Sequence, residues 1–203
     1  CAGLIELDNI NKESYLNSEL IYIEGYLWDQ QATIENLQRL IMKAKTAKCQ
    51  IAFSLSDSFC VQRHHESFKA LIENQIDILF GNEEEIKAIF DVTSLNANSL
   101  KQIQSLIKQM KCKIIAITLN KKGCIILTKE DILEVGTKKV KAIDSTGAGD
   151  AFAAGFLYGH LKGNSLTESA NIANKLAAEV VGHIGARPKV SLKEYQITTK
   201  KIA

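Results

Sequence analysis

The sequence of 203 residues has no block of like charge. Its 25 Lys and Arg residues and 23 Asp and Glu residues are interspersed, and the formal net charge is only +2. A nucleic-acid-binding arm or a helix that binds a membrane surface needs clustered basic residues. We therefore expect a small-molecule partner and neither a nucleic acid nor a membrane.

Long apolar runs are also missing. No uncharged apolar stretch approaches the roughly 20 residues that cross a bilayer, and the first residues lack the basic-then-apolar order of a signal peptide. These absences predict a cytoplasmic protein. The chain begins at Cys1 rather than Met, which suggests a fragment of a longer protein.

The cysteines form no recognisable framework. They are five in number and scattered, at positions 1, 49, 60, 112 and 124. Most of them stand in apolar runs, which predicts buried free thiols in a reducing compartment, and no pair has the close spacing of a zinc site. His64 and His65 lie near Cys60, but adjacent histidines point in different directions on a helix. A solvated helix face is the preferred interpretation there.

The chain does have enough apolar residues for one α/β core, since 46% of it is hydrophobic. Apolar runs and helical periods alternate. Strands are predicted at 20–25, 50–55, 76–80 and 113–119, and helices at 30–47, 61–74, from Glu83 onward and at 97–110, with a short helix near 14–20. This alternation is typical of a parallel sheet covered by helices.

The rhythm changes in the last third of the chain. Short strands at 124–128 and 132–135 predict an antiparallel edge. An almost wholly apolar helix follows at 148–160, with Gly155 and Gly159 on one closely packed face, and Ser165 caps another helix that extends to about Val181. The predicted fold class is a three-layer α/β/α domain with a mostly parallel sheet and an antiparallel edge.

One stretch, DSTGAGD from Asp144 to Asp150, has the composition of a phosphate cradle. Two glycines allow a tight, bare turn, and the helix that follows would direct its unpaired N–H groups at an anion. Asp150 adds a carboxylate in the first turn. The stretch lacks the third glycine of a dinucleotide fingerprint and the GlyLysSer/Thr of a P-loop.

Together with AlaPheAlaAlaGlyPhe behind it, this stretch resembles the GAGD motif of the ribokinase-like (PfkB) carbohydrate kinases, usually AspThrXaaGlyAlaGlyAsp. Only Ser145 departs from that pattern. The resemblance implies that Asp150 is the catalytic base. It also implies that the amides of Gly147, Ala148 and Gly149 bind the phosphoryl group that ATP donates, with Mg²⁺ as a further requirement.

Asn82 and Glu85, in GlyAsnGluGluGlu, have two interpretations. Asn at a helix N-cap with Glu three residues later is an ordinary capping box. The resembling kinases carry AsnXaaXaaGlu at this point, which implies that both residues arrange magnesium and phosphate through ordered water. The two roles can coexist.

The resemblance implies further contacts in the second half of the chain. Thr118 and Gly123 match the family's nucleotide-binding ThrXaaGlyXaaXaaGly, although Asn120 replaces its first glycine; an edge hairpin without ligand is the alternative. Asn174 would lie by the adenine, or would be a buried structural side chain. Asp144 and Thr146 are candidate ligands of a monovalent cation such as K⁺. Tyr26 and Trp28 are expected in core or rim packing.

The resemblance covers nearly all of residues 1–203 and implies that they are the C-terminal portion of a kinase domain. The family's N-terminal strands and lid, with the acceptor-binding GlyGly motif, have no match here. An exposed sheet edge would then invite association, for example as a homodimer. We expect an ATP-dependent phosphotransferase acting on a hydroxymethyl group of a sugar or nucleoside, in an adenosine-kinase-like branch, and we expect residues 1–203 alone to have little or no kinase activity. The alternative is a truncated, inactive binding module of the same fold.

Overall fold

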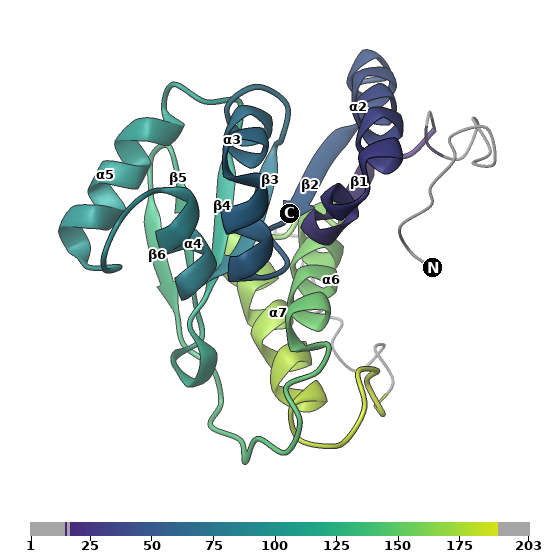
Figure 1. Cartoon of the computed structure of the whole chain (residues 1–203). Coiled ribbons are helices and arrows are strands. Elements are labelled where there is room, and N and C mark those ends of the chain that lie inside the picture. Colours follow the sequence, from purple (N-terminus) through teal and green to yellow (C-terminus); the bar gives the residue numbers. More distant parts are fainter. Residues whose placement is uncertain (1–14, 16, 191–203) are drawn as a thin grey trace, which may run out of the picture. The chain divides into compact units, whose positions relative to one another are not determined.

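The computed structural model describes Tyr15 and residues 17–190 (Figure 1). The described chain divides into two compact units. The first contains the residues up to 117 together with 127–132, and the second contains 118–126 and the residues from 133 onward. Of the helix predicted near 14–20, Ser14 and Leu16 lie outside the described residues, as does Cys1; Tyr15 is helical, but residues 17–19 are not, and β1 begins at Leu20.

Six strands form one mixed sheet, hydrogen bonded in the order β1-β2-β3-β4-β5-β6. They are β1 (Leu20–Glu24), β2 (Gln50–Ser54), β3 (Ile78–Asn82), β4 (Ile114–Thr118), β5 (Cys124–Thr128) and β6 (Ile132–Val135). The first three pair in parallel, with Glu24 opposite Ser54. A tight turn, in which the Thr128 amide donates to the Asp131 carbonyl at 2.8 Å, joins β5 to β6 at the antiparallel edge. The predicted α/β fold class is confirmed.

The helices of the first unit follow its strands. They are η2 (Gly25–Asp29), α2 (Gln31–Thr46), α3 (Ser58–Asn74), α4 (Glu83–Ile89) and α5 (Ala97–Ile107). Helix α3 begins three residues before the predicted start because the Asp57 carboxylate accepts a hydrogen bond from the Cys60 amide at 2.7 Å and caps the helix. At His64 the helix is kinked, with φ −121° and ψ 21°.

Three aromatic rings form the centre of the first unit's core. Trp28, Phe53 and Phe68 meet edge to face, with ring centroids 4.9 to 5.8 Å apart, a favourable aromatic geometry. Trp28 is 1% exposed, so the expected core packing is confirmed for this residue. Tyr26, by contrast, is exposed. These contacts fix η2 against β2 and α3.

The second unit contains η3 (Asn120–Lys122), α6 (Ala148–Leu161) and α7 (Leu166–Val180), and α6 and α7 lie side by side (Figure 1). A Cβ atom added at Gly155 would lie 2.8 Å from Ala173 Cα, and one added at Gly159 would lie 2.8 Å from Ser169 Cα. The predicted close packing of this glycine face is thus confirmed. Ser165 and Glu168 form the expected capping box of α7.

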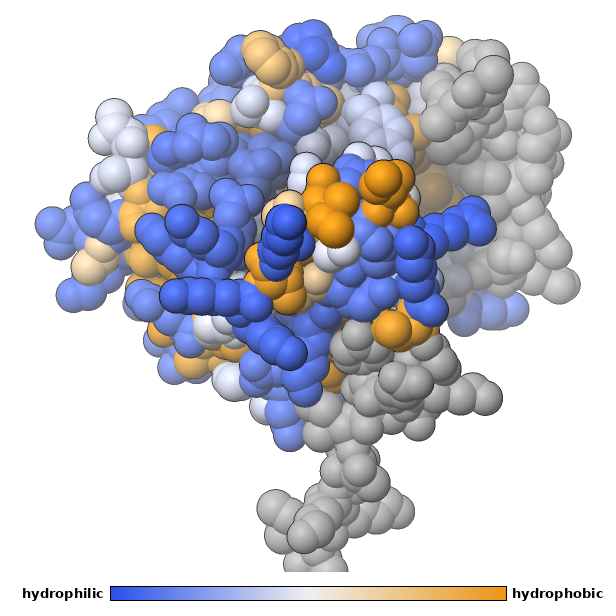
Figure 2. Space-filling model, turned by 90° about the horizontal axis from the view of Figure 1, so that it is seen from below, coloured by the Kyte–Doolittle hydropathy of each residue, from blue (hydrophilic) through white to orange (hydrophobic). Residues whose placement is uncertain are grey.

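One face of the molecule is mainly hydrophilic (Figure 2). Figure 2 shows one face on which polar side chains dominate and hydrophobic ones form small groups. Cys49, Cys60, Cys112 and Cys124 are buried and free, as predicted. Among the described residues, every helix is too short or too polar to cross a membrane.

Candidate functional site

Helix α6 begins at an uncapped turn. Its N-cap, Gly147, has the left-handed φ of +77°, and no side chain accepts a hydrogen bond from the first turn. The Ala148 amide donates to the Ser145 carbonyl at 3.2 Å, and the Ala151 amide makes the first helical bond, to the Gly147 carbonyl. The amides of Gly149 and Asp150 lie between these two bonds at the helix start, where N–H groups point toward an incoming anion.

The two glycines of this turn have different surroundings. A Cβ atom at Gly147 would lie 2.6 Å from Ala186 Cβ, so close approach and positive φ both require glycine there. A Cβ atom at Gly149 would meet nothing within 4 Å. Asp150 is exposed beside Gly149. The turn therefore presents bare backbone and a carboxylate to open space.

Asp144 holds this turn against the end of α7. Its carboxylate accepts hydrogen bonds from the amides of Thr146 at 2.9 Å and Gly185 at 3.1 Å. The hydrogen bonds from Thr146, and then that from Gly185, lower the pKa of Asp144 to about 2. The Ile143 amide also donates to the Val181 carbonyl at 2.8 Å. Both oxygens retain lone pairs, so a monovalent cation at Asp144 and Thr146 is compatible with these bonds.

Asn82 and Glu85 form a closed capping box at the start of α4. The Asn82 side chain accepts from the Glu85 amide at 2.9 Å, and the Glu85 carboxylate accepts from the Asn82 amide at 2.9 Å and from Asn82 Nδ2 at 2.6 Å. Glu85 is only 6% exposed. Burial raises its pKa, and the nearby carboxylates of Asp57 and Glu24 raise it further. The capping interpretation is confirmed, while the magnesium role remains a prediction.

Sequence reasoning missed Glu24 and Ser56 at the same edge of the sheet. Glu24 ends β1, and its carboxylate accepts a hydrogen bond from Ser56 Oγ at 2.9 Å. Glu24, Asp57 and Glu85 follow the carboxyl ends of β1, β2 and β3, which is the edge where parallel sheets bind ligands. That position at a strand end was the signal available in the sequence.

The turn after β4 survives the replacement of its first glycine. Asn120 adopts φ +52°, as its side chain permits, and the Leu119 amide donates to the Gly123 carbonyl at 2.8 Å. Gly123 has φ +95°, and a Cβ atom there would lie 2.1 Å from the Val135 carbonyl oxygen. Thr118, at the end of β4, is half-buried. A closed turn therefore forms with Asn120 in the place of the first glycine, while nucleotide contact by Thr118 and Gly123 remains a prediction.

Asn174 has structural partners. Its Nδ2 donates to the carbonyls of Val135 at 3.0 Å and Gly136 at 3.2 Å, and the residue is buried. The side chain thus ties α7 to the end of β6, which agrees with the structural interpretation. Contact with an adenine remains a prediction.

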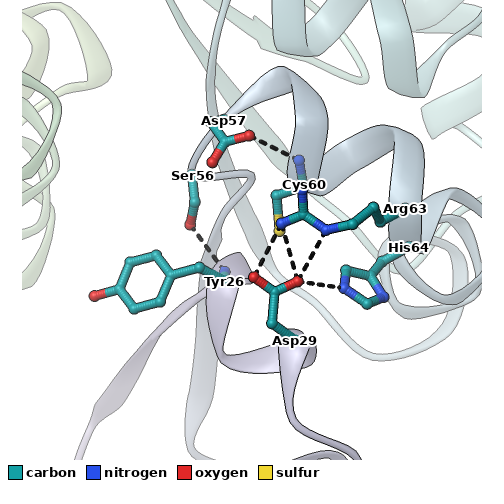
Figure 3. A network of polar contacts seen from close by, with 7 residues as sticks. All are labelled: Tyr26, Asp29, Ser56, Asp57, Cys60, Arg63 and His64. Carbon is teal, nitrogen blue, oxygen red and sulfur yellow. Dashed lines mark hydrogen bonds and ion pairs between the residues drawn. The ribbon is translucent and has the colours of Figure 1, made fainter. Parts of the chain in front are cut away.

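A separate polar network joins η2 to α3 (Figure 3). Arg63 Nη2 donates to both oxygens of Asp29 at 3.0 and 2.9 Å, and His64 Nε2 lies 2.8 Å from Asp29 Oδ1. The hydrogen bond with His64, followed by that with Arg63, lowers the pKa of Asp29. Cys60 is completely buried beneath the network. The helix face at His64 was predicted to be solvated, but His64 is half-buried and paired with Asp29.

Comparison with known proteins agrees with the motif. A model of the pfkB family carbohydrate kinases matches residues 4–192. An uncharacterized sugar kinase of Archaeoglobus fulgidus is 27% identical over 183 residues, which are 90% of this chain and 69% of that protein. The crystal structure of adenosine kinase from Sinorhizobium meliloti has a TM-score of 0.87 and 33% identity, covering 96% of this chain and 58% of that one.

A second solved structure gives the same result. A probable sugar kinase from Rhizobium etli CFN 42 has a TM-score of 0.87 and 32% identity, covering 96% of this chain and 57% of that one. The chain therefore spans a little over half the length of both solved neighbours.

Proposed function

Because the chain belongs to the pfkB family of carbohydrate kinases, we propose that the turn from Asp144 to Asp150 serves transfer of a phosphoryl group from ATP to a hydroxymethyl group. The observation that carries this proposal is the start of α6, where a left-handed glycine replaces a side-chain cap and an exposed carboxylate stands in the first turn. An anion-binding helix start needs bare amides, and a proton acceptor beside them suits attack by a hydroxyl.

Each residue of the turn has its own part in this proposal. Asp150 accepts the proton of the acceptor hydroxyl. The amides at Gly147, Ala148 and Gly149 stabilise the transferring group, and Gly149 contributes most freely because the Ala148 amide already donates to Ser145. Asp144 keeps the turn in shape through its two accepted hydrogen bonds. Positioning and electrostatics dominate phosphoryl transfer. The turn supplies both, through its backbone amides and through Asp150.

Magnesium and nucleotide contacts extend the proposal to other residues. Both oxygens of Glu85 are engaged by Asn82, so we assign Asn82 and Glu85 to Mg²⁺ through bound water, a mode that suits this ion. Mg²⁺ neutralises charge on the phosphates. Thr118, Gly123 and Asn174 are assigned to the nucleotide, and Asp144 and Thr146 to K⁺.

The acceptor is proposed to be a sugar or nucleoside, with adenosine and ribose as first choices. Two named neighbours support this range, since one is described as an adenosine kinase and the other as a probable sugar kinase. Adenosine and ribose each present a primary alcohol as the phosphoryl acceptor. The turn described above would treat these alcohols alike, so other parts of the protein must select between them.

The proposal is tested in two steps. Calorimetry with a non-hydrolysable ATP analogue and Mg²⁺ measures nucleotide binding, and a phosphorylation assay with adenosine, ribose, fructose and cytidine measures transfer. Asp150→Asn should lower turnover at least about 100-fold, the scale of a general base. It should leave nucleotide affinity within about twofold, which is a change of less than about 1 kcal/mol. Glu130→Gln, an exposed carboxylate in the β5–β6 turn, is the matched control.

The outcomes separate the candidate functions. Turnover that Asp150→Asn abolishes and Glu130→Gln preserves supports the kinase. Nucleotide binding without turnover of any acceptor favours the inactive binding module. Turnover retained by Asp150→Asn, or no nucleotide binding at all, contradicts the assignment of the turn.

A further inference from the structure

We propose that Asp29, Cys60 and His64 form a site for a thiophilic divalent cation, with Zn²⁺ as the best fit. The three side chains offer a carboxylate oxygen, a thiol sulfur and an imidazole nitrogen, and these donor atoms all lie within 4.8 Å of one another. Zinc binds this set of donors. The site is independent of the phosphoryl transfer proposed above.

The kinked helix α3 supplies two of the ligands. Cys60 and His64 are four residues apart and therefore share one face of the helix. The backbone leaves helical geometry at His64, where φ is −121° and ψ is 21°, and the imidazole reaches Asp29 at the end of η2 (Figure 3). Asp29 precedes His64 by 35 residues. The fold thus adds a third ligand that no local spacing predicts.

Coordination requires the three donor atoms, which lie within 4.8 Å of one another, to adjust their spacing. Zinc bonds of about 2.0 to 2.3 Å at tetrahedral angles hold neighbouring donors about 3.3 to 3.6 Å apart. His64 Nε2 and Asp29 Oδ1 are now 2.8 Å apart, so they would separate by about half an ångström to admit the ion. The Cys60 thiol would give its proton to solvent as the thiolate binds the metal.

Two of the three ligands are open to solvent. The Asp29 and His64 side chains are 39% and 19% exposed, whereas Cys60 is fully buried. Water could therefore occupy a fourth position on the open side, as in zinc sites with three protein ligands.

Arg63 also faces this site, and its guanidinium carries a positive charge like that of the metal ion. Its guanidinium binds Asp29 through both carboxylate oxygens and is half-exposed. A carboxylate has lone pairs for a metal and a guanidinium together, and a partner in the outer shell orients a metal-binding carboxylate. Arg63 therefore holds Asp29 in position before the ion arrives.

His65 provides a matched control in the next position of the chain. Its Nδ1 lies 3.0 Å from Glu66 Oε1, and its Nε2 lies 3.5 Å from Asp91 Oδ1, away from Cys60. Substitution of His64 should weaken metal binding, and the same substitution at His65 should not.

The test uses the full chain without a histidine tag, stripped of metal by a chelator. Zn²⁺ affinity is measured by competition with a chromophoric chelator, and Co²⁺ is added to look for thiolate-to-cobalt charge-transfer absorption. Cys60→Ser, His64→Gln and Asp29→Asn should each weaken binding at least 10- to 100-fold, the effect of losing even an outer-shell partner. Zn²⁺ should also raise the melting temperature of the wild-type chain.

The result expected is one Zn²⁺ per chain, a cobalt–thiolate band that Cys60→Ser removes, and unchanged affinity in His65→Gln. Asp29→Asn alters an exposed side chain and keeps the test valid if Cys60→Ser fails to fold. No Zn²⁺ binding by the wild-type chain, no cobalt–thiolate band, or equal losses in His64→Gln and His65→Gln would overturn the proposal.

Discussion

Two helix starts in this protein use the same backbone groups in opposite ways. At α4, Asn82 and Glu85 close the helix start with their own side chains, and Glu85 is buried in the process. At α6, Gly147 turns the chain without any side-chain cap, and the space beside Gly149 is open. A closed start stabilises the fold, whereas an open one keeps its N–H groups for an anion.

The largest difference should appear when each glycine of the open start is replaced by alanine. Gly147→Ala forces a positive φ on alanine and a clash with Ala186, which should lower the free energy of unfolding by about 3 kcal/mol. Gly149→Ala enters open space and should change it by less than about 1 kcal/mol, toward higher stability. Urea unfolding followed by circular dichroism measures both, and equal losses would mean that Gly147 is not a required turn.

A smaller effect is expected at the closed starts. Asn82→Ala and Ser165→Ala each remove an N-cap and should each lower the free energy of unfolding by about 1 kcal/mol. Only Asn82→Ala should also raise the Mg²⁺ concentration needed for half-maximal nucleotide binding. If the two variants behave alike in magnesium titrations, Asn82 is a cap and nothing more.

The smallest effect concerns pH. The native pKa of Asp144 is lowered from 3.8 to about 2, so its contribution to stability is complete above about pH 4 and disappears as the pH falls through about 2. The native pKa of Glu85 is raised above 4.5, so its ionised form opposes folding and protonation relieves this as the pH falls. The two carboxylates should therefore give slopes of opposite sign.

Urea midpoints between pH 3 and 7 measure these slopes. The stability of wild type relative to Asp144→Asn should shrink toward the acid end, and that of wild type relative to Glu85→Gln should grow as the pH decreases from neutral. Slopes of the same sign would show that one of these carboxylates does not have the environment described here.

The sequence predicted elements whose ends are set locally. Strands 124–128 and 132–135 were predicted with their observed bounds, since apolar runs and a polar turn define them. The start of α3 was wrong by three residues because Asp57, a polar side chain without apolar period, decides where the helix begins. The cap at Ser165 was also predictable, because Ser165 and Glu168 lie only three residues apart in the sequence.

The candidate site was predictable only where one motif contains it. The turn at Gly147 could be identified because its glycines and Asp150 are adjacent in the chain. Glu24 and Ser56 are 32 residues apart, and Asp29 and His64 are 35 apart, so neither pairing leaves a local pattern. Asn82 and Glu85 stay ambiguous since one spacing serves both a cap and a ligand.

The Ile143 amide donates to the Val181 carbonyl, and the Gly185 amide donates to the Asp144 carboxylate, so two bonds join chain positions 38 and 41 residues apart. Both bonds tether the stretch before α6 to the segment that follows α7, so separation of these two segments would expose both amides together. The amides of Ile143 and Gly185 should therefore exchange with deuterium at a shared rate. Fraying at the C-terminal end of α7 should therefore shorten the lifetime of the turn before α6, and a partner that binds there should lengthen it.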